Sequence, residues 1–186
     1  MPHMLLQPGM TAPLFTATDV HGREVRLDRF VGQPILLSFY RSAACQICSL
    51  RLWYLRQQLP ALSATGLQII GIFETSLETT LSYARDISQV IPTIADPQQD
   101  LFRLYQARRR SLTGFMRGYF GRLPRVAEAI RRNLGKISDG NHLQLPADFL
   151  LTPDLTIAQA HYGKDIGDHL PFAAIQTFAE QFQRVR

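Results

Sequence analysis

Two strand-length apolar segments, separated by a helical pattern, constrain the fold of this chain more than any other feature. The segments PILLSFY at residues 34–40 and LQIIGIF at residues 67–73 are continuous apolar runs, typical of strands that are covered on both faces. From Cys45 onward apolar residues recur at helical spacing, and we expect Pro60 to end this helix. Strand, helix and strand in this order predict a parallel βαβ unit with a right-handed crossover, and therefore an α/β protein.

Two antiparallel hairpins are predicted on either side of this unit. The first lies within residues 8–27, where short β-prone pieces flank a turn at His21 and Gly22. The second joins strands at residues 148–152 and 156–162 through a tight turn. The two hairpins would add antiparallel strands to a fold that is otherwise parallel.

Helical patterns account for most of the remaining chain. A helix is predicted over residues 77–89, and a closing amphipathic helix over residues 170–185. Residues 91–107 predict a loop followed by a short helix, which Asp96 would cap.

The composition and the opening residues indicate the size of the core and the expected cellular location. Its 186 residues, 46% of them apolar and 19% charged, are enough for a substantial hydrophobic core. The sequence has no run of about eighteen apolar residues, and its opening MPHMLLQPGM lacks a basic start followed by a long apolar stretch. We therefore expect neither a membrane span nor a secretory signal, and a cytoplasmic location.

The two cysteines of the chain, Cys45 and Cys48, lie where the first strand pattern gives way to the helix pattern. In a reducing compartment a core of this size does not need a disulfide, so redox, catalytic or metal roles remain. A cysteine at a helix N-terminus faces free backbone N–H groups and the positive end of the helix dipole, which stabilise its thiolate. Cys45 is therefore the candidate nucleophile, and Cys48, one turn deeper, lies close enough to form a disulfide with it.

Two other interpretations of the cysteine pair stay open. Small buried thiols are common in protein cores, and Cys48 alone would be taken for one. A zinc site would need two more ligands, and the candidates are scattered without metal-binding spacing: His142, His161 and His169. We expect neither a metal nor a cofactor.

A parallel βαβ unit with a cysteine pair between its first strand and helix, followed by a hairpin and a last helix, is the layout of the thioredoxin fold. Residues 9–182 resemble the AhpC/TSA peroxiredoxin-like family, above all its C-x-x-C branch, in which FYR precedes the cysteines. The matching segments are PGMTAPLFTATDVHGREVRL, ILLSFYRSAACQICSLRL, IADPQQDLFRLYQ and LPADFLLTPDLTIAQAHYGKDIGDHLP. The resemblance implies an α/β, thioredoxin-like three-layer fold: a central mixed sheet flanked by helices, with an N-terminal β-hairpin and an Arg-rich helical insertion at about residues 108–140. Residues 1–186 would form a single domain.

The resemblance also implies a thiol-dependent oxidoreductase. Cys45 would attack a hydroperoxide or a protein disulfide, and Cys48 would be the resolving thiol. An external thiol reductant, such as a thioredoxin- or glutaredoxin-like protein, would then reopen the disulfide. Peroxide reduction is the first expectation and protein disulfide exchange is the alternative. A second alternative is a non-catalytic thioredoxin-fold binding protein that uses its Arg-rich helices.

The sequence departs from the family pattern at the substrate site. Typical peroxiredoxins carry P-x-x-x-T/S-x-x-C and a distant arginine that polarises the O–O bond, but here Ser38, Ser42 and Pro146 occupy the proline, hydroxyl and arginine slots. These departures favour disulfide exchange, whereas the family resemblance favours peroxide. Thioredoxin-like proteins often place a cis-proline before this strand, and its preceding residue, here Leu145, offers backbone hydrogen bonds to a disulfide substrate. The substrate-binding candidates are therefore Arg41, which would add positive potential beside the cysteines, and Ser42, Leu145 and Pro146.

The formal net charge of +5 is concentrated in one segment. Residues 103–136 carry ten basic side chains against the single acid Glu128. The segment predicts two short amphipathic helices, each with an apolar face and an arginine face. We expect an insertion that covers the redox face or the sheet edge, and its apolar face would equally suit a homo-oligomer. Binding to an anionic membrane surface or a partner is a second interpretation. Nucleic acid is a weaker third, because no nucleic-acid-binding motif accompanies the charge.

Overall fold

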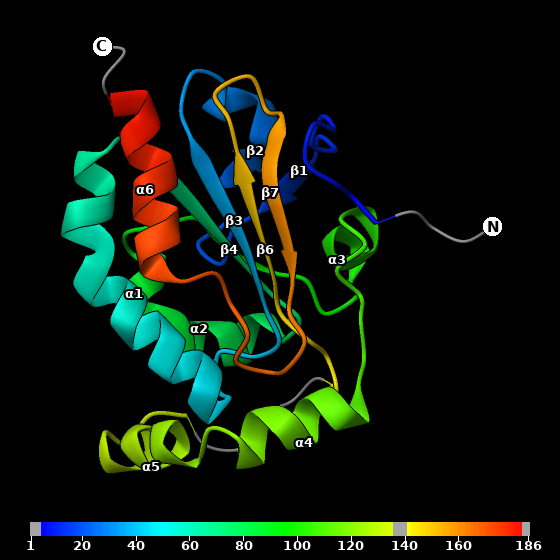
Figure 1. Cartoon of the computed structure of the whole chain (residues 1–186), viewed down its shortest axis with the longest axis vertical. Coiled ribbons are helices and arrows are strands. Elements are labelled where there is room, and N and C mark those ends of the chain that lie inside the picture. Colours follow the sequence, from blue (N-terminus) through cyan, green and yellow to red (C-terminus); the bar gives the residue numbers. More distant parts are fainter. Residues whose placement is uncertain (1–4, 136–140, 184–186) are drawn as a thin grey trace.

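A five-stranded mixed sheet forms the centre of the protein, as seen in a computed structural model that describes residues 5–135 and 141–183 (Figure 1). The strand order is β5-β4-β3-β6-β7, in which β3, β4 and β5 run parallel and β6 and β7 complete the sheet with antiparallel pairings. The bounds are β3 Ile35–Tyr40, β4 Gln68–Phe73, β5 Thr93–Ala95, β6 Ala147–Leu151 and β7 Ile157–Tyr162. The predicted βαβ unit, the second hairpin and the thioredoxin-like three-layer class are confirmed.

Helices flank this sheet, and a separate two-stranded hairpin precedes it. The hairpin is β1 Thr16–Thr18 with β2 Glu24–Arg26, which confirms the predicted N-terminal hairpin, and the short 3-10 helix η1 Leu27–Phe30 follows it. The helices are α1 Gln46–Ala64, α2 Leu77–Ser88, α3 Asp100–Leu104, α4 Leu112–Phe120, α5 Leu123–Arg131 and α6 Phe172–Gln183. None of the helices within the described ranges has the length and apolar character needed to cross a membrane.

The central strand β3 is buried along its whole length and divides the interior into two cores. Ile35, Leu37 and Phe39 face a core that the N-terminal segment and α3 close, whereas Leu36 and Tyr40 face α1, α2 and α6. Figure 1 shows α1 and α6 on one side of the sheet and α3 with the N-terminal segment on the other. Because both faces are covered, every side chain of the strand is apolar or, like Ser38, hydrogen-bonded.

Two predictions about local structure were wrong. Pro60 does not end the first helix, because α1 continues to Ala64. A proline removes only one backbone donor, and the buried side chain of Leu62 holds the last turn in the core. The loop predicted before Asp96 contains strand β5, which pairs with β4. Three residues are too few to show a period in the sequence, so only the neighbouring strand reveals them.

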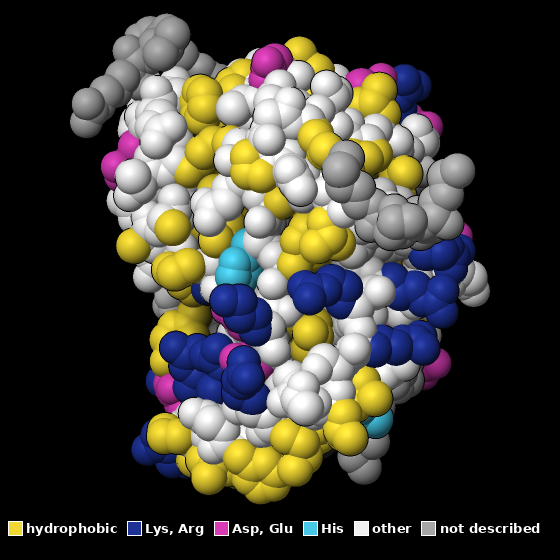
Figure 2. Space-filling model, turned by 45° about the vertical axis from the view of Figure 1, so that its right-hand side comes forward, with side chains coloured by type: hydrophobic (Ala, Val, Ile, Leu, Met, Phe, Trp, Pro, Cys, Tyr) yellow, Lys and Arg dark blue, Asp and Glu magenta, His cyan; other side chains and the backbone are white. Residues whose placement is uncertain are grey.

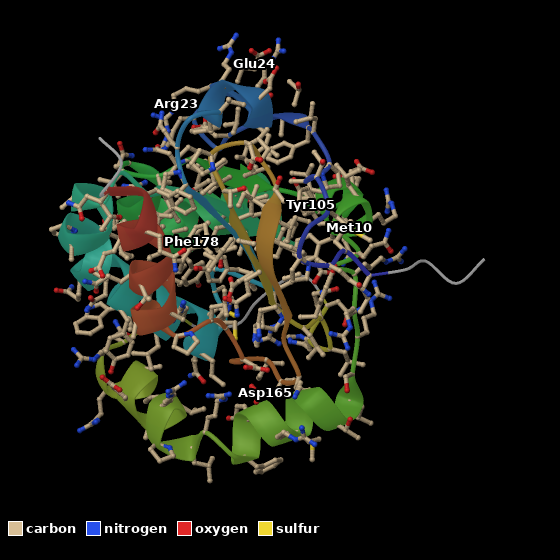
Figure 3. All side chains as sticks on the ribbon, turned by 45° about the horizontal axis from the view of Figure 1, so that its top comes forward. Met10, Arg23, Glu24, Tyr105, Asp165 and Phe178 are labelled. Carbon is tan, nitrogen blue, oxygen red and sulfur yellow. The ribbon has the colours of Figure 1, made fainter. Side chains whose placement is uncertain are left out.

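Helices α4 and α5 confirm the two short helices predicted from the arginine-rich segment, and residues 136–140 of the predicted insertion lie outside the described residues. Helices α4 and α5 form a layer beneath one end of the sheet (Figure 1). Arg23 and Glu24 lie at the opposite end of the molecule (Figure 3). Two glycines let α4 approach the loop after β7 closely. A Cβ atom at Gly114 would lie 2.8 Å from the carbonyl oxygen of Lys164, and one at Gly118 would lie 2.9 Å from the backbone nitrogen of Ile166.

The close approach of α4 predicts that Gly118→Ala destabilises the protein. The new methyl group meets backbone, which cannot rotate away, so we expect the free energy of unfolding to fall by about 1–3 kcal/mol in spite of the better helix propensity of alanine. Urea unfolding followed by circular dichroism measures the change. Met116→Ala, on the exposed face of the same helix, is the matched control and should stay within about 0.5 kcal/mol of the parent. A Gly118→Ala protein as stable as this control would contradict the packing.

Candidate active site at the cysteine pair

The cysteine pair lies where β3 ends and α1 begins. Cys45 is the N-cap residue of α1, and Cys48 lies in the first turn of that helix. Both are free thiols and are buried, with exposed fractions of 6% and 2%. The connecting residues 41–44 are all buried, and three of them are small, which lets the chain turn tightly from strand to helix.

Arg41 is the charged partner of Cys45. One terminal nitrogen of its guanidinium, Nη2, donates a hydrogen bond to Cys45 Sγ, and the other, Nη1, donates to the carbonyl oxygen of His142 at 3.0 Å. The side chain is buried, and its Nε has no hydrogen-bond partner within the described residues. A buried guanidinium against a buried sulfur favours the thiolate, because each charge compensates the other.

The pKa values of the two thiols are shifted in opposite directions. A hydrogen bond from the Cys48 thiol lowers the pKa of Cys45 to about 5, with help from the charge of Arg41 and the backbone N–H of Cys48 and against the effect of burial. The same hydrogen bond, together with burial, raises the pKa of Cys48 well above its usual value. At neutral pH the pair is therefore a Cys45 thiolate beside a protonated Cys48 thiol, which suits one nucleophile and one proton-bearing second thiol.

The α4–α5 layer closes the site from outside. The two cysteines form one buried apolar cluster with four other side chains, and Phe115 lies at its edge: Ile47, Val126, Leu145 and Ile166. The chain after α5 also passes over the cysteine loop, since a Cβ atom at Gly135 would lie 2.6 Å from the carbonyl oxygen of Ala44 and 2.8 Å from the nitrogen of Gln46. These contacts bear out the expectation that the insertion covers the redox face, whereas binding to a membrane surface or a partner stays a prediction.

The substrate-binding candidates have different contacts in the structure. The Ser42 hydroxyl accepts a hydrogen bond from the Ala44 backbone N–H at 3.1 Å, so it shapes the cysteine loop. Leu145 belongs to the buried apolar cluster that contains both cysteines. Pro146 is buried, accepts a hydrogen bond from the Gly163 N–H through its carbonyl oxygen at 2.9 Å, and follows a trans peptide bond. The sequence left the cis or trans state of this bond open.

Two features of the site go beyond the residues predicted for it. The carbonyl oxygen of His142 orients Arg41, and no sequence signal marks a backbone acceptor. A buried polar group, Glu74 with Gln99 and Gln144, also lies at the same end of the sheet, where the Glu74 N–H donates to the Tyr40 carbonyl oxygen. Burial raises the pKa of Glu74 to about 7, although nearby positive charge and hydrogen bonds oppose this. The position of an acid directly after a buried strand was the available signal.

Two other acids near the cysteines have structural partners. Asp148 pairs with His169 Nδ1 at 3.1 Å and accepts a hydrogen bond from Ser38 inside the core. Asp165, labelled in Figure 3 on the loop beside α4, accepts two hydrogen bonds from Arg122 at 3.0 and 2.9 Å and so ties that loop to the start of α5. These contacts fix the sheet and the covering layer, and they do not join either acid to a sulfur.

A metal centre finds no support in the described part of the chain, where no group of three or more His, Cys, Asp and Glu side chains is arranged to hold a metal ion.

The chain is similar in sequence to several known proteins. Peroxiredoxin Bcp of Escherichia coli (strain K12) is 34% identical over 67 residues, which are 36% of this chain and 43% of that protein. Thiol-disulfide oxidoreductase ResA of Geobacillus thermodenitrificans is 27% identical over 99 residues, covering 52% of this chain and 56% of that protein. The chain matches only 43% to 65% of the length of such curated relatives.

Among solved structures, peroxidoxin BcpB from Mycobacterium tuberculosis superposes with a TM-score of 0.64 over 97% of both chains, and at 16% identity this likeness concerns the fold. The family model described as "AhpC/TSA family" matches residues 8–160, which include both cysteines, Arg41 and all of the central sheet except the end of β7. The chain belongs to the AhpC/TSA family.

Proposed function

We propose that this protein reduces hydroperoxides, with Cys45 as the nucleophile and Cys48 as the resolving thiol. The observation that carries the proposal is the contact of the Arg41 guanidinium with the Cys45 sulfur at the start of α1. The thiolate is the form of cysteine that attacks an O–O bond, and this contact stabilises it. Relatives named peroxiredoxin and thiol-disulfide oxidoreductase both support thiol-based redox chemistry.

The reaction balances with these two thiols and an external reductant. The Cys45 thiolate attacks one oxygen of the hydroperoxide, the O–O bond breaks, and the departing alkoxide takes a proton to leave as an alcohol. Cys45 is then a sulfenic acid. The Cys48 thiol attacks its sulfur, water leaves, and a disulfide joins the two residues. Two thiols of a thioredoxin- or glutaredoxin-like protein would reduce this disulfide, in keeping with a cytoplasmic location.

Arg41 is also the proposed substrate-binding residue. Its Nε–H has no partner within the described residues, while its two terminal nitrogens hold Cys45 and the His142 carbonyl oxygen. A hydroperoxide oxygen beside the thiolate could accept from this free donor, which would polarise the O–O bond as it breaks. In this proposal Arg41 supplies the positive charge next to the nucleophile, Ser42 shapes the loop, and Leu145 and Pro146 form the apolar wall.

Protein disulfide exchange is the second candidate, and the C-x-x-C pair at a helix N-terminus favours it. Two contacts weigh against it. The backbone groups of Leu145 are already engaged, because its N–H donates to the Arg109 carbonyl oxygen at 2.8 Å and its carbonyl oxygen accepts from Gln144 at 2.8 Å. A protein disulfide would also have to reach a sulfur that α4 and α5 cover, whereas a peroxide is small. These contacts favour the smaller substrate.

The low pKa of Cys45 predicts a characteristic pH profile of alkylation. With the thiolate as the reactive form, the rate of iodoacetamide labelling at Cys45 should be flat above about pH 6 and fall to half near pH 5. An ordinary cysteine would reach half its rate near about pH 8.5. Peptide mass spectrometry assigns the label and should find Cys48 unlabelled over the same range.

Replacement of Arg41 separates its effect on the pKa of Cys45 from the effect of Cys48. In Arg41→Gln we expect the midpoint to rise by about 1–3 pH units, because the stabilising positive charge is gone. Arg85→Gln, which removes an exposed arginine from α2, is the matched control and should leave the midpoint unchanged. A wild-type midpoint near pH 8.5 would contradict the proposed thiolate.

The peroxidase reaction itself can be followed through Trp53. This residue lies on α1, and the Arg132 guanidinium carbon lies 3.9 Å from its ring centre, so a change at the cysteines or in the covering layer should alter its fluorescence. Reduced protein mixed with a hydroperoxide in a stopped-flow instrument should react at a rate that rises with peroxide concentration. We expect Cys45→Ser to abolish the reaction, and Cys48→Ser to stop at a sulfenic acid that dimedone traps.

The same proteins distinguish the two candidate functions. If wild-type protein, shown by mass to be fully reduced, ignores hydroperoxides but reduces the disulfides of insulin, the peroxidase proposal fails and disulfide exchange replaces it. If Cys48→Ser forms no sulfenic acid, Cys45 is not a peroxide nucleophile.

A further inference from the structure

The outward face of α4 and its turn into α5 is apolar, which is the reverse of an ordinary surface helix. Small glycines at positions 114 and 118 face inward. Bulky apolar side chains face outward, with exposed fractions between 46% and 63%, and we call them the apolar ridge: Leu112, Met116, Phe120 and Leu123. Figure 2 shows hydrophobic side chains gathered at this end of the molecule, next to Lys and Arg side chains. A contiguous exposed apolar surface of this kind marks an interaction site.

Exposed arginines lie on the same two helices as the ridge. Arg117 lies on α4, and Arg125 and Arg131 lie on α5; within the described ranges no salt bridge engages them. The one acid in α4 and α5, Glu128, already accepts hydrogen bonds from Tyr54 and Arg132. The face therefore combines a row of apolar side chains with arginines that form no salt bridge in the described ranges.

This charge decides which partner fits. Two copies meeting through this face would bring their arginines together, and like charges oppose such a dimer. A surface that carries negative charge over an apolar interior complements both features. The ridge lies on a helix at one end of the molecule (Figure 1).

We propose that the apolar ridge inserts into the interface of an anionic lipid membrane, with Arg117, Arg125 and Arg131 against the lipid headgroups. Helices bind membranes in this way when apolar side chains reach the acyl boundary and basic side chains meet anionic lipids. The proposal concerns the outer face of the layer and does not depend on what the cysteines do. It places the cysteine face of the protein next to the membrane, because the α4–α5 layer covers the cysteines with its inner side and carries the ridge on its outer side.

Vesicle co-sedimentation tests the proposal with the full chain. We expect binding to sucrose-loaded vesicles of phosphatidylcholine and phosphatidylglycerol, and little binding to vesicles of phosphatidylcholine alone. Leu112→Ser combined with Phe120→Ser keeps the net charge, and it should weaken partitioning at least about tenfold because two inserting side chains are lost. Arg117→Gln combined with Arg125→Gln should weaken it about 25-fold by removing two headgroup contacts.

Matched control variants separate insertion from general attraction of a basic protein. Val31→Ser combined with Val90→Ser removes apolar side chains that are 58% and 62% exposed away from α4, and binding should be unchanged. Arg29→Gln combined with Arg85→Gln lowers the net charge by the same amount elsewhere, and should weaken binding by less than about twofold. Thermal unfolding should show that each variant is folded.

Three results would overturn the proposal. Equal binding of the Leu112→Ser/Phe120→Ser variant would mean electrostatic attraction without insertion. Absence of binding to anionic vesicles would leave the ridge to a protein partner. A dimer in sedimentation velocity that becomes a monomer in the same variant would assign the ridge to a second copy of this chain.

Discussion

The contact between Arg41 and Cys45 is the interaction on which the rest of the site depends. A buried thiolate and a buried guanidinium are each costly alone, and together they compensate each other only if both are held in place. The strand end and the helix start provide this placement, since β3 fixes the direction of Arg41 and α1 fixes Cys45 at its N-cap. The His142 carbonyl oxygen then fixes the other side of the guanidinium.

The layer formed by α4 and α5 has a different role on each of its two sides. Its inner side supplies Val126 to the apolar wall around the sulfurs and keeps the ion pair away from water. Low solvent access strengthens the attraction between thiolate and guanidinium, and it also restricts which substrates can arrive. Glycines allow the layer to pack this closely, and the bulky residues that would normally face a core therefore lie on the outside. Burial of the site and exposure of the ridge follow from the same arrangement of α4.

Much of this architecture could be predicted because it depends on local patterns. The apolar runs at residues 34–40 and 67–73 predicted two buried parallel strands, and the position of Cys45 and Cys48 between strand and helix predicted the site. The path of α1 past Pro60 and the strand β5 were mispredicted, because each depends on a packing partner far away in the sequence. The roles of Arg41, Ser42, Leu145 and Pro146 in substrate binding, and the single-domain assignment of residues 1–186, stay predictions.

The sequence by itself determined the α/β class, the place of the cysteine pair and the concentration of positive charge, because each is written in the spacing or the identity of neighbouring residues. Only the tertiary structure decided which partner each buried charge meets and which face of α4 turns inward. Helical periodicity defines an apolar face but not the surface that it meets. Which face of α4 turns inward depends on the shape of the loop after β7. The two glycines of α4 fit against this loop, whereas a larger side chain would collide with it.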